Sequence, residues 1–585
     1  MKTRRAPLLA VAVGLVAAAA YLPAWPGAFH FDDFHSLVDN PMLDLAAAPE
    51  IFTNPGLFSG LSVSDYRPLT LLSFSLQSGR WPLRPGPLVA VNIMIHGLCS
   101  ALFFGVALIL LRSEGKALLA AAVFALHPLQ GEAVNYISCR ATLLAAGFAL
   151  AAVLLLLRAA RARGARRAAA YIASLLLLSL ALLSKSEAFA AAFIPLLFAL
   201  TVPADRWEGL RMRRAALMFL AVAAAYLAVR GLVGVEVMVP ARPIRPIPAN
   251  LATGARAAAA YLGLFLWPAG LSVVQDLKPS PHWYDYRAAA AGGALLALLA
   301  LAWRSRKERP LLFTGLCWYG LGLAPTVTLV PLHNVMAEHR TYFSMAGLAL
   351  AAAEALWWMM ASPSGAAAPA LARRRIIAPA ALALLLAAWL AGTVHRSREW
   401  RSDTALWRAA AERAPSNPTS WVNLGVAWWE AGRVKQSAAA FERALALDPG
   451  NLPAMTDLGR IYMDRGEVEK GVAILEDVLK RAPGEPEVHY NLARAYALLQ
   501  EYRLAEKHYQ ATLAGMPGHL AACENLAALY VYNLGEGDKA RELMAHCLAM
   551  RPSPEEVIRI RVMLADLAAI ERKPGGKDRT GTAKP

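Results

Sequence analysis

Apolar runs of roughly 20 residues, the length at which a helix crosses a bilayer, recur between about Ala6 and Ala391. Alanine and leucine dominate these runs, and the breaks between them are short and rich in arginine. Over the 585 residues, 57% are hydrophobic and only 17% carry a charged side chain. The pattern predicts an all-α, polytopic membrane domain for the first two-thirds of the chain.

The positive charges are placed as in membrane proteins. A formal net charge of +17 could indicate nucleic-acid binding, but the arginines fall in brief clusters between the apolar runs. This is the positive-inside pattern, which sets membrane topology, so we expect no nucleic-acid partner. The clusters lie at 2–5, 158–167, 206–214, 304–309 and 373–375.

Eleven crossings are consistent with these clusters. We predict spans near 6–24, 88–111, 117–134, 141–157, 169–184, 187–202, 212–232, 288–303, 311–331, 341–360 and 376–394. The first resembles a signal peptide, and we interpret it as an uncleaved span. A further stretch, 251–274, is broken by Trp267 and Pro268, and we expect it to enter the membrane only in part. All arginine clusters then lie in the cytoplasm, and the C-terminal region lies outside.

A repeat begins where the composition becomes soluble, after His395. Prolines recur every 34 residues, at Pro415, Pro449, Pro483 and Pro517, and leucines and aromatic residues recur in step. This is the period of tetratricopeptide (TPR) helix pairs. We predict a membrane domain at 1–395, a TPR solenoid of about four repeats with flanking helices at 396–571, and a disordered tail at 572–585. The last repeat carries one extra residue near 535–537. TPR arrays bind proteins in a concave groove or act as spacers, and we favour binding.

Two adjacent carboxylates, Asp32 and Asp33, stand between aromatic residues just after the first span, in a predicted outer loop at 25–87. Ionised aspartates beside hydrocarbon are costly, so their presence requires a reason. One of them could cap a short helix, but a cap needs only one Asp. We therefore favour a functional role for the pair.

Other polar side chains fall on the same predicted side. They are Arg67, His127, Glu132, Arg140, Lys185, Glu338 and Arg340. Cations beside membrane-edge carboxylates suit an anionic, lipid-linked substrate such as a polyprenyl phosphate, whose tail stays in the bilayer. Each residue also has a structural alternative, such as a helix end, an interfacial snorkel or an internal ion pair. No HExxH, CxxC or Walker motif is present, so we predict no metal and no cofactor.

The order of these motifs resembles that of a known family. The matching pieces are Phe31-Asp32-Asp33 with Asn40, Tyr66-Arg67-Pro68-Leu69, Val91-Asn92 with Ile95-His96, His127-Pro128 with Glu132, Arg140-Ala141, Ser184-Lys185, Glu338-His339-Arg340 with Tyr342, and Trp400 with Trp407. Over nearly its whole length, the chain resembles the transmembrane and TPR-containing (TMTC-like) O-mannosyltransferases, which are membrane glycosyltransferases of the GT-C type. Cys139-Arg140-Ala141-Thr142 departs from the family's Gly-Arg-Ala-Asp and puts a supporting acid in doubt.

The resemblance implies an inverting glycosyltransferase that moves mannose or another hexose from a polyprenyl-phosphate carrier to protein Ser or Thr hydroxyls. Asp32 or Asp33 would be the base, and Arg67, Arg140, Lys185 and Arg340 would hold the donor phosphate. His127, Glu132 and Glu338 would orient substrates, and the TPR groove would bind the acceptor protein. We expect the enzyme in a bacterial inner membrane with the repeats in the periplasm. A non-catalytic TPR scaffold for envelope proteins is the alternative, and a transporter ranks last.

Overall fold

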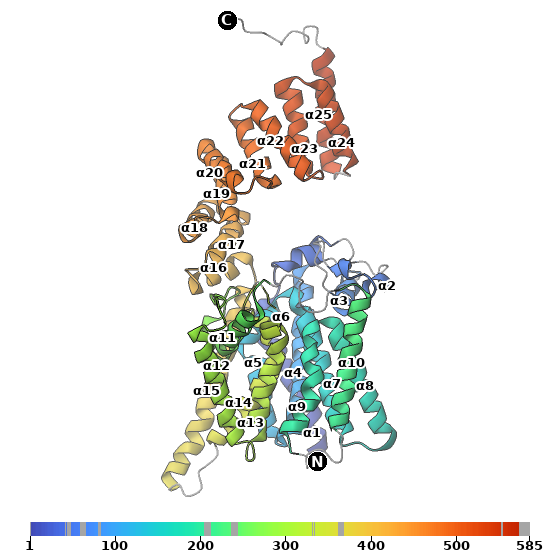
Figure 1. Cartoon of the computed structure of the whole chain (residues 1–585), viewed down its shortest axis with the longest axis vertical. Coiled ribbons are helices and arrows are strands. Elements are labelled where there is room, and N and C mark those ends of the chain that lie inside the picture. Colours follow the sequence, from blue (N-terminus) through green and yellow to red (C-terminus); the bar gives the residue numbers. More distant parts are fainter. Residues whose placement is uncertain are drawn as a thin grey trace. The chain divides into compact units, whose positions relative to one another are not determined.

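The computed structural model describes the chain except for residues 1, 41–42, 44–47, 59–65, 80–82, 204–211, 236–243, 330, 333, 361–367, 551–553 and 573–585. Its described residues form helices and connecting segments with no strand, which confirms the all-α prediction (Figure 1). The chain divides into two compact units, Met1–Ala414 and Pro415–Pro585. The predicted tail lies almost wholly outside the described residues.

The first unit is a bundle of long apolar helices. Among the described residues, eight helices are long and apolar enough to cross a membrane, or nine if a pair bent by 49° counts as one span. The eight are Arg5–Ala24, Pro85–Leu111, Ile137–Ala159, Gly164–Ser184, Met212–Leu232, Tyr286–Arg304, Pro310–Val327 and Ile377–Glu399. The bent pair is Glu114–Leu126 with Pro128–Asn135, and two shorter apolar helices are Ser186–Thr201 and Ser344–Met360. These segments coincide in position with the eleven predicted crossings, but the two shorter helices do not qualify as candidate spans.

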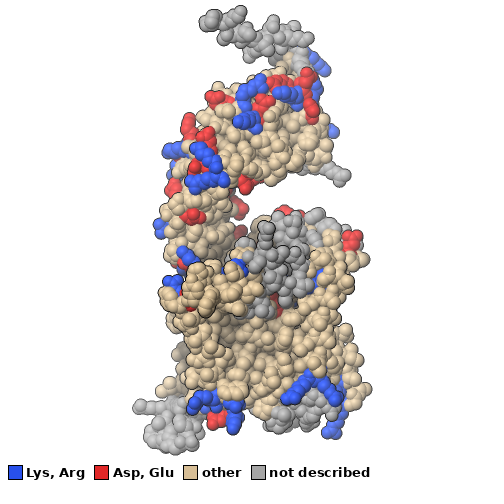
Figure 2. All heavy atoms as spheres, viewed as in Figure 1, with Lys and Arg blue, Asp and Glu red and all other residues tan. Residues whose placement is uncertain are grey.

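The unit has two distinct ends. The turn between α7 (Arg140–Ala159) and α8 (Gly164–Ser184) and that between α12 (Tyr286–Arg304) and α13 (Pro310–Leu323) lie at the end where the chain begins (Figure 1). Figure 2 shows Lys and Arg side chains gathered at that end of the unit. We call the opposite end the outer face, in line with the positive-inside pattern.

The interrupted stretch predicted at 251–274 becomes α11 (Ile247–Leu266), which does not qualify among the candidate spans of the described residues. It ends at Trp267, where Pro268 begins a short 3-10 turn, because proline cannot continue a helix. The Tyr261 hydroxyl donates to the Ala337 carbonyl at 2.9 Å. This contact ties α11 to the segment before η11 (Glu338–Thr341) at the outer face.

The first outer loop, predicted at 25–87, contains short helices. They are α2 (Ala48–Ile51), η4 (Pro55–Phe58) and α3 (Pro68–Ser78). The Thr70 hydroxyl of α3 donates to the Ser184 carbonyl at 2.9 Å. This bond places the C-terminal end of α8 beside the loop, so the next residue, Lys185, belongs to the outer face.

Two glycines bring α13 and α14 (Ser344–Met360) into close contact. A methyl group on Gly315 would lie 2.4 Å from the Gly347 carbonyl oxygen, a distance that no side chain tolerates. Membrane helices commonly use small residues in this way, because close backbone packing replaces the missing hydrophobic drive. The contact fixes the start of α14 and therefore the short η11 segment that precedes it.

The second unit is the predicted solenoid. Helix pairs begin in 34-residue register at α17 (Pro418–Glu430), α19 (Leu452–Asp464), α21 (Pro486–Leu498) and α23 (Leu520–Leu529). Their partners are α18 (Val434–Leu447), α20 (Val468–Arg481), α22 (Tyr502–Gly515) and α24 (Gly537–Ala549), and α25 (Pro554–Arg572) follows. The extra residue of the last repeat is absorbed by a π-helical turn, Tyr530–Leu534, as single insertions in helices often are.

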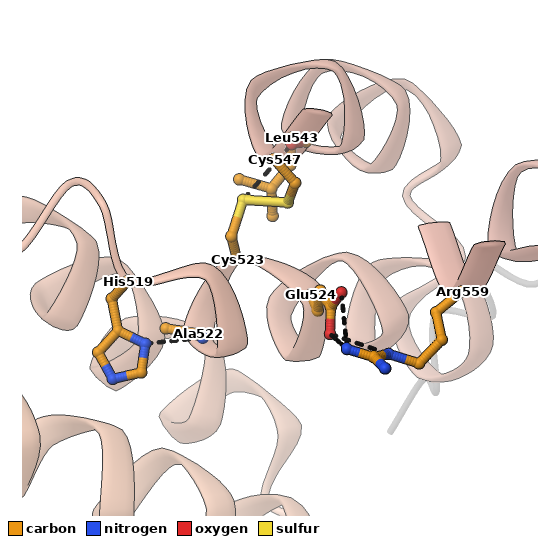
Figure 3. Close-up of a disulfide and its surroundings, with 7 residues drawn as sticks. All are labelled: His519, Ala522, Cys523, Glu524, Leu543, Cys547 and Arg559. Atoms are coloured by element: carbon orange, nitrogen blue, oxygen red, sulfur yellow. Dashed lines mark hydrogen bonds and ion pairs between the residues drawn. A yellow bond between two sulfur atoms is a disulfide. The ribbon is translucent and has the colours of Figure 1, made fainter. Parts of the chain in front are cut away.

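A disulfide joins Cys523 of α23 to Cys547 of α24 (Figure 3). The two cysteines are 24 residues apart and belong to no short cysteine motif. Helix pairing in the repeat is what brings them together. Arg559 of α25 lies 3.1 Å from the Glu524 carboxylate on α23, so the last helix is attached to the same repeat.

Candidate active site

Asp33 anchors the segment 29–40, which we call the aspartate loop. Its side chain is fully buried, and one carboxylate oxygen accepts the backbone N–H of His30 at 2.9 Å. The other accepts both the backbone N–H and the hydroxyl of Ser138, at 2.9 and 2.5 Å. Burial raises the pKa of Asp33 to about 6, although the bonds from Ser138 and His30 act against this rise. With its oxygens occupied, Asp33 holds the loop in shape.

Asp32, by contrast, is accessible. Its side chain is 67% exposed, and its carboxylate lies 3.3 Å from His35 Nε2. Its backbone N–H donates to the Tyr136 hydroxyl at 2.9 Å. The preceding residue, Phe31, has a φ of 48°, a left-handed conformation that a bulky residue rarely adopts and that clusters at functional sites. The loop therefore buries one aspartate and presents the other.

His30 links this loop to the end of the membrane unit. Its Nδ1 lies 2.6 Å from the Asp403 carboxylate, and its Nε2 lies 3.1 Å from the Trp400 carbonyl oxygen. Burial acts to lower the pKa of His30, but the hydrogen bond and charge of Asp403 raise it above its usual value. Because both partners are acceptors, a doubly protonated imidazolium satisfies both of them.

Aromatic rings enclose the same loop. Phe31 meets Tyr136 and Trp407 edge-on, with centroids 5.5 and 5.2 Å away. Tyr136 stacks on Trp400 at 5.8 Å. Trp407 lies in α16 (Asp403–Arg413), which belongs to the membrane unit although the sequence places it with the repeats. The tryptophans singled out before the repeats therefore help to build the aspartate site.

Arg140 is engaged inside the protein. It is fully buried at the start of α7, and its Nε donates to the Asn92 side-chain oxygen at 3.0 Å. Its other nitrogens donate to the Leu88 and Ser73 carbonyls at 3.0 and 3.5 Å. Asn92 in turn donates to the Tyr136 carbonyl at 3.1 Å. This geometry supports a positioning role for Arg140, behind the site, in place of the expected phosphate contact.

Lys185 lies at the outer face, as expected. Its ammonium group contacts Glu187 at 2.9 Å and donates to the Thr142 hydroxyl at 2.9 Å. The Glu187 carboxylate also interacts electrostatically with His339 and Arg340. Lys185 and Arg340, which were predicted from separate motifs, therefore share one electrostatic neighbourhood around Glu187. Lys185 brings a charge that Glu187 already balances in part.

The predicted Glu132 and Glu338 are both buried and paired. Glu132 lies 2.7 Å from His339 Nδ1, and Glu338 lies 3.3 Å from Arg396. Burial raises the pKa of Glu338 to about 7, against the charge of Arg396. Arg396 also pairs with Glu399 at 2.7 Å. The sequence analysis missed Arg396 and Glu399, since both stand at the end of an apolar run with no motif around them.

His127 is a structural residue in this geometry. It is fully buried; its Nε2 lies 2.9 Å from the Phe265 carbonyl, and its Nδ1 accepts the Leu129 N–H at 3.2 Å. Its ring also contacts Trp389, with centroids 4.7 Å apart. Both ring nitrogens are occupied, so His127 caps a helix break, which is the structural alternative considered for it.

Arg67 and Arg340 remain the most accessible of the predicted cations. Both are half-buried. Arg67 precedes Pro68 at the start of α3, and Arg340 donates to the Asn334 and Val335 carbonyls at 2.7 and 3.3 Å.

Among the residues that the structure describes, no group of three or more His, Cys, Asp or Glu is arranged to hold a metal ion.

Comparison with known proteins agrees with this architecture. Tetratricopeptide repeat models match residues 401–451, 428–495 and 519–551. Mouse Protein O-mannosyl-transferase TMTC3 is 34% identical over 146 residues, which cover 24% of this chain and 16% of that protein. Human TMTC4 is 34% identical over 161 residues, covering 24% and 21%. Protein O-mannosyl-transferase F38B6.6 of Caenorhabditis elegans is 24% identical over 455 residues, covering 73% and 61%.

Solved structures align with the chain only at low similarity. The crystal structure of MamA aligns with a TM-score of 0.24 and 18% identity, covering 25% of this chain and 86% of that one. Scores at this level do not bear on fold or function. The curated relatives are matched over part of their length only, from about a sixth to about three-fifths.

The fold and site define a polytopic α-helical membrane protein with a C-terminal TPR solenoid and a buried-and-exposed aspartate pair at its outer face. The chain is similar over part of its length to the protein O-mannosyl-transferases named above, and its C-terminal unit matches tetratricopeptide repeat models.

Proposed function

We propose that the chain is a membrane glycosyltransferase that moves a sugar, mannose or another hexose, from a polyprenyl-phosphate carrier to a hydroxyl of an acceptor protein. The observation that carries the proposal is the division of labour between Asp33 and Asp32. Asp33 fixes the loop from inside, and Asp32 presents an exposed carboxylate beside it.

Asp32 is the proposed general base. An inverting transfer needs a carboxylate that takes the acceptor's proton as its oxygen attacks the anomeric carbon. The bond from the sugar to the carrier phosphate then breaks, and its electrons stay on the phosphate. Cations must stabilise that developing charge, and Arg340, Lys185 and Arg67 are the proposed groups. No metal is required by this mechanism.

Two features support an extracytoplasmic site. The aspartate loop lies opposite the arginine-rich turns. The disulfide in the solenoid is of a kind that persists in oxidising compartments, consistent with repeats outside the cytoplasm. We propose that the repeats bind the acceptor protein and that the protein resides in a bacterial inner membrane with the repeats on the periplasmic side.

The test is a transfer assay in membranes at matched expression. Radiolabelled polyprenyl-phosphate mannose, and a second polyprenyl-phosphate sugar alongside it, are supplied to wild type and Asp32→Asn. We expect labelled protein from wild type and a loss of roughly a thousandfold or more in Asp32→Asn, as for a group that acts in the reaction. Asp39→Asn, a second acid of the same loop, is the matched control. Equal labelling by wild type and Asp32→Asn would rule out this base.

A further inference from the structure

Arg245 has no role in the site described so far. It lies between α10 (Met212–Leu232) and α11, and one of its terminal nitrogens donates to the Leu332 carbonyl. Its Nε and its other terminal nitrogen are buried and have no hydrogen-bond partner in the described part of the chain. A buried donor without an acceptor is costly, and such groups often mark the place of an ion or ligand.

A second arginine is bound to the same short segment. Arg340 donates to the carbonyls of Asn334 and Val335, close in sequence to the carbonyl that Arg245 uses. Carbonyl oxygens are uncharged, so these bonds gather two guanidinium groups without neutralising either. Burial, and then the charge of Arg340, lower the pKa of Arg245, and no described acidic side chain offsets them.

Two other arginines of this unit, Arg396 and Arg256, have carboxylate partners. Arg396 pairs with Glu338 and Glu399, and Arg256 pairs with Asp285 at 3.2 Å. Arg140 is buried without a carboxylate partner, but a neutral oxygen accepts from each of its three nitrogens, whereas two nitrogens of Arg245 have no acceptor among the described residues. Of the acids around Arg340, Glu187 interacts with it electrostatically but is already paired with Lys185. The neighbourhood therefore keeps an excess of positive charge.

We propose that Arg245 and Arg340 form a clamp for a phosphate group at the outer face. Guanidinium groups match phosphate oxygens in geometry and stay charged when partly buried. A bound phosphate would supply acceptors for the free donors of Arg245 and neutralise the repulsion between the two arginines. The assignment of this phosphate to a lipid-linked sugar donor rests on the proposed function. The proposal that the site binds a phosphate is independent of that function.

Binding of a defined probe tests the clamp without any transfer step. The full-length protein in phosphatidylcholine nanodiscs is titrated with radiolabelled polyprenyl monophosphate, in the presence or absence of inorganic phosphate. The variants are Arg245→Gln, Arg340→Gln and their double variant. Arg287→Gln is the matched control, because Arg287 is an exposed arginine at the start of α12.

We expect each clamp variant to weaken binding about tenfold or more, as for a lost charge-assisted hydrogen bond, while Arg287→Gln binds as wild type does. The double variant should lose less than the product of the single losses, since both arginines hold one phosphate. Competition by inorganic phosphate at similar concentration would assign the site to a free phosphate, and resistance to it would assign the site to the lipid.

The thermal stability of the unliganded protein separates a ligand site from a structural role. Arg245→Gln removes a guanidinium group that has unsatisfied donors and lies near the charge of Arg340. The midpoint of thermal unfolding of this variant should therefore equal that of wild type or exceed it. A lower midpoint with unchanged binding would overturn the clamp, as would a wild type that binds neither probe. Asp32→Asn should bind the probe normally. If wild type binds the probe but transfers sugar from neither polyprenyl-phosphate donor, the clamp stands and the transferase proposal fails.

Discussion

The bond between His30 and Asp403 offers the sharpest single perturbation of the aspartate loop. In Asp403→Asn the carboxylate becomes an amide of the same size, and the buried His30 loses its charged partner at 2.6 Å. A hydrogen bond between charged groups contributes about 1.5–3 kcal/mol. The backbone N–H of His30 donates to Asp33, so a displaced His30 also disturbs the aspartate loop. We therefore expect kcat/KM to fall roughly 10- to 100-fold in Asp403→Asn.

The assay is the same transfer reaction, run with a series of acceptor concentrations and over a range of pH. Raised by Asp403, the pKa of His30 lies above its usual value, so the bond is complete at low pH and is lost as pH rises through that pKa. The activity of wild type should therefore approach that of Asp403→Asn at high pH. Glu412→Gln, an exposed acid of the same helix, is the control.

A double-mutant cycle decides whether the effect passes through His30. Asp403→Asn should change activity far less in a His30→Gln background than in wild type, because the partner is already gone. Losses that simply multiply would refute the reasoning, and so would an Asp403→Asn variant as active as Glu412→Gln.

Three further expectations follow from other contacts. Ser138→Ala removes a hydrogen-bond donor that lowers the pKa of Asp33. The pKa of Asp33 should therefore rise above about 6, and the acidic limb of the pH–rate profile should move to higher pH. An unmoved limb would show that Ser138 does not control the pKa of Asp33. Cys523→Ser removes the disulfide, which closes a sequence separation of 24, and should lower the free energy of unfolding of the solenoid by about 3 kcal/mol. The thermal midpoint of the full chain should fall, and added reductant should not lower the midpoint of this variant further. Arg396→Gln leaves Glu338 buried without its cation and should destabilise the unit by about 3 kcal/mol, whereas Arg398→Gln should not.

Periodicity explains why most of the architecture could be predicted. Apolar runs of bilayer length and a 34-residue repeat are properties of single segments, so the sequence is enough to find them. The broken stretch at 251–274 was recognisable because Trp267, Pro268 and Gly270 interrupt its apolar run. The π turn at Tyr530–Leu534 also follows from counting, since one residue too many must be absorbed somewhere.

The division of roles within the site could not be predicted in the same way. Asp32 and Asp33 are neighbours of one residue type, and only the partners contributed by Ser138 and His30 make one buried and the other exposed. Arg140 and Arg245 differ in the same sense. The first has neutral acceptors all around it, whereas the second retains free donors. Such differences depend on contacts between distant segments, which no local pattern records.

The position of helix α16 has a consequence for how this architecture can vary in evolution. The helix that the repeat period would assign to the array belongs to the membrane unit, where Asp403 and Trp407 contact the aspartate loop. From Pro415 onward, the described helices α17 to α24 form whole repeat pairs, and α25 follows them. An array can therefore gain or lose 34-residue steps beyond this point without altering the contacts that α16 makes with the aspartate loop.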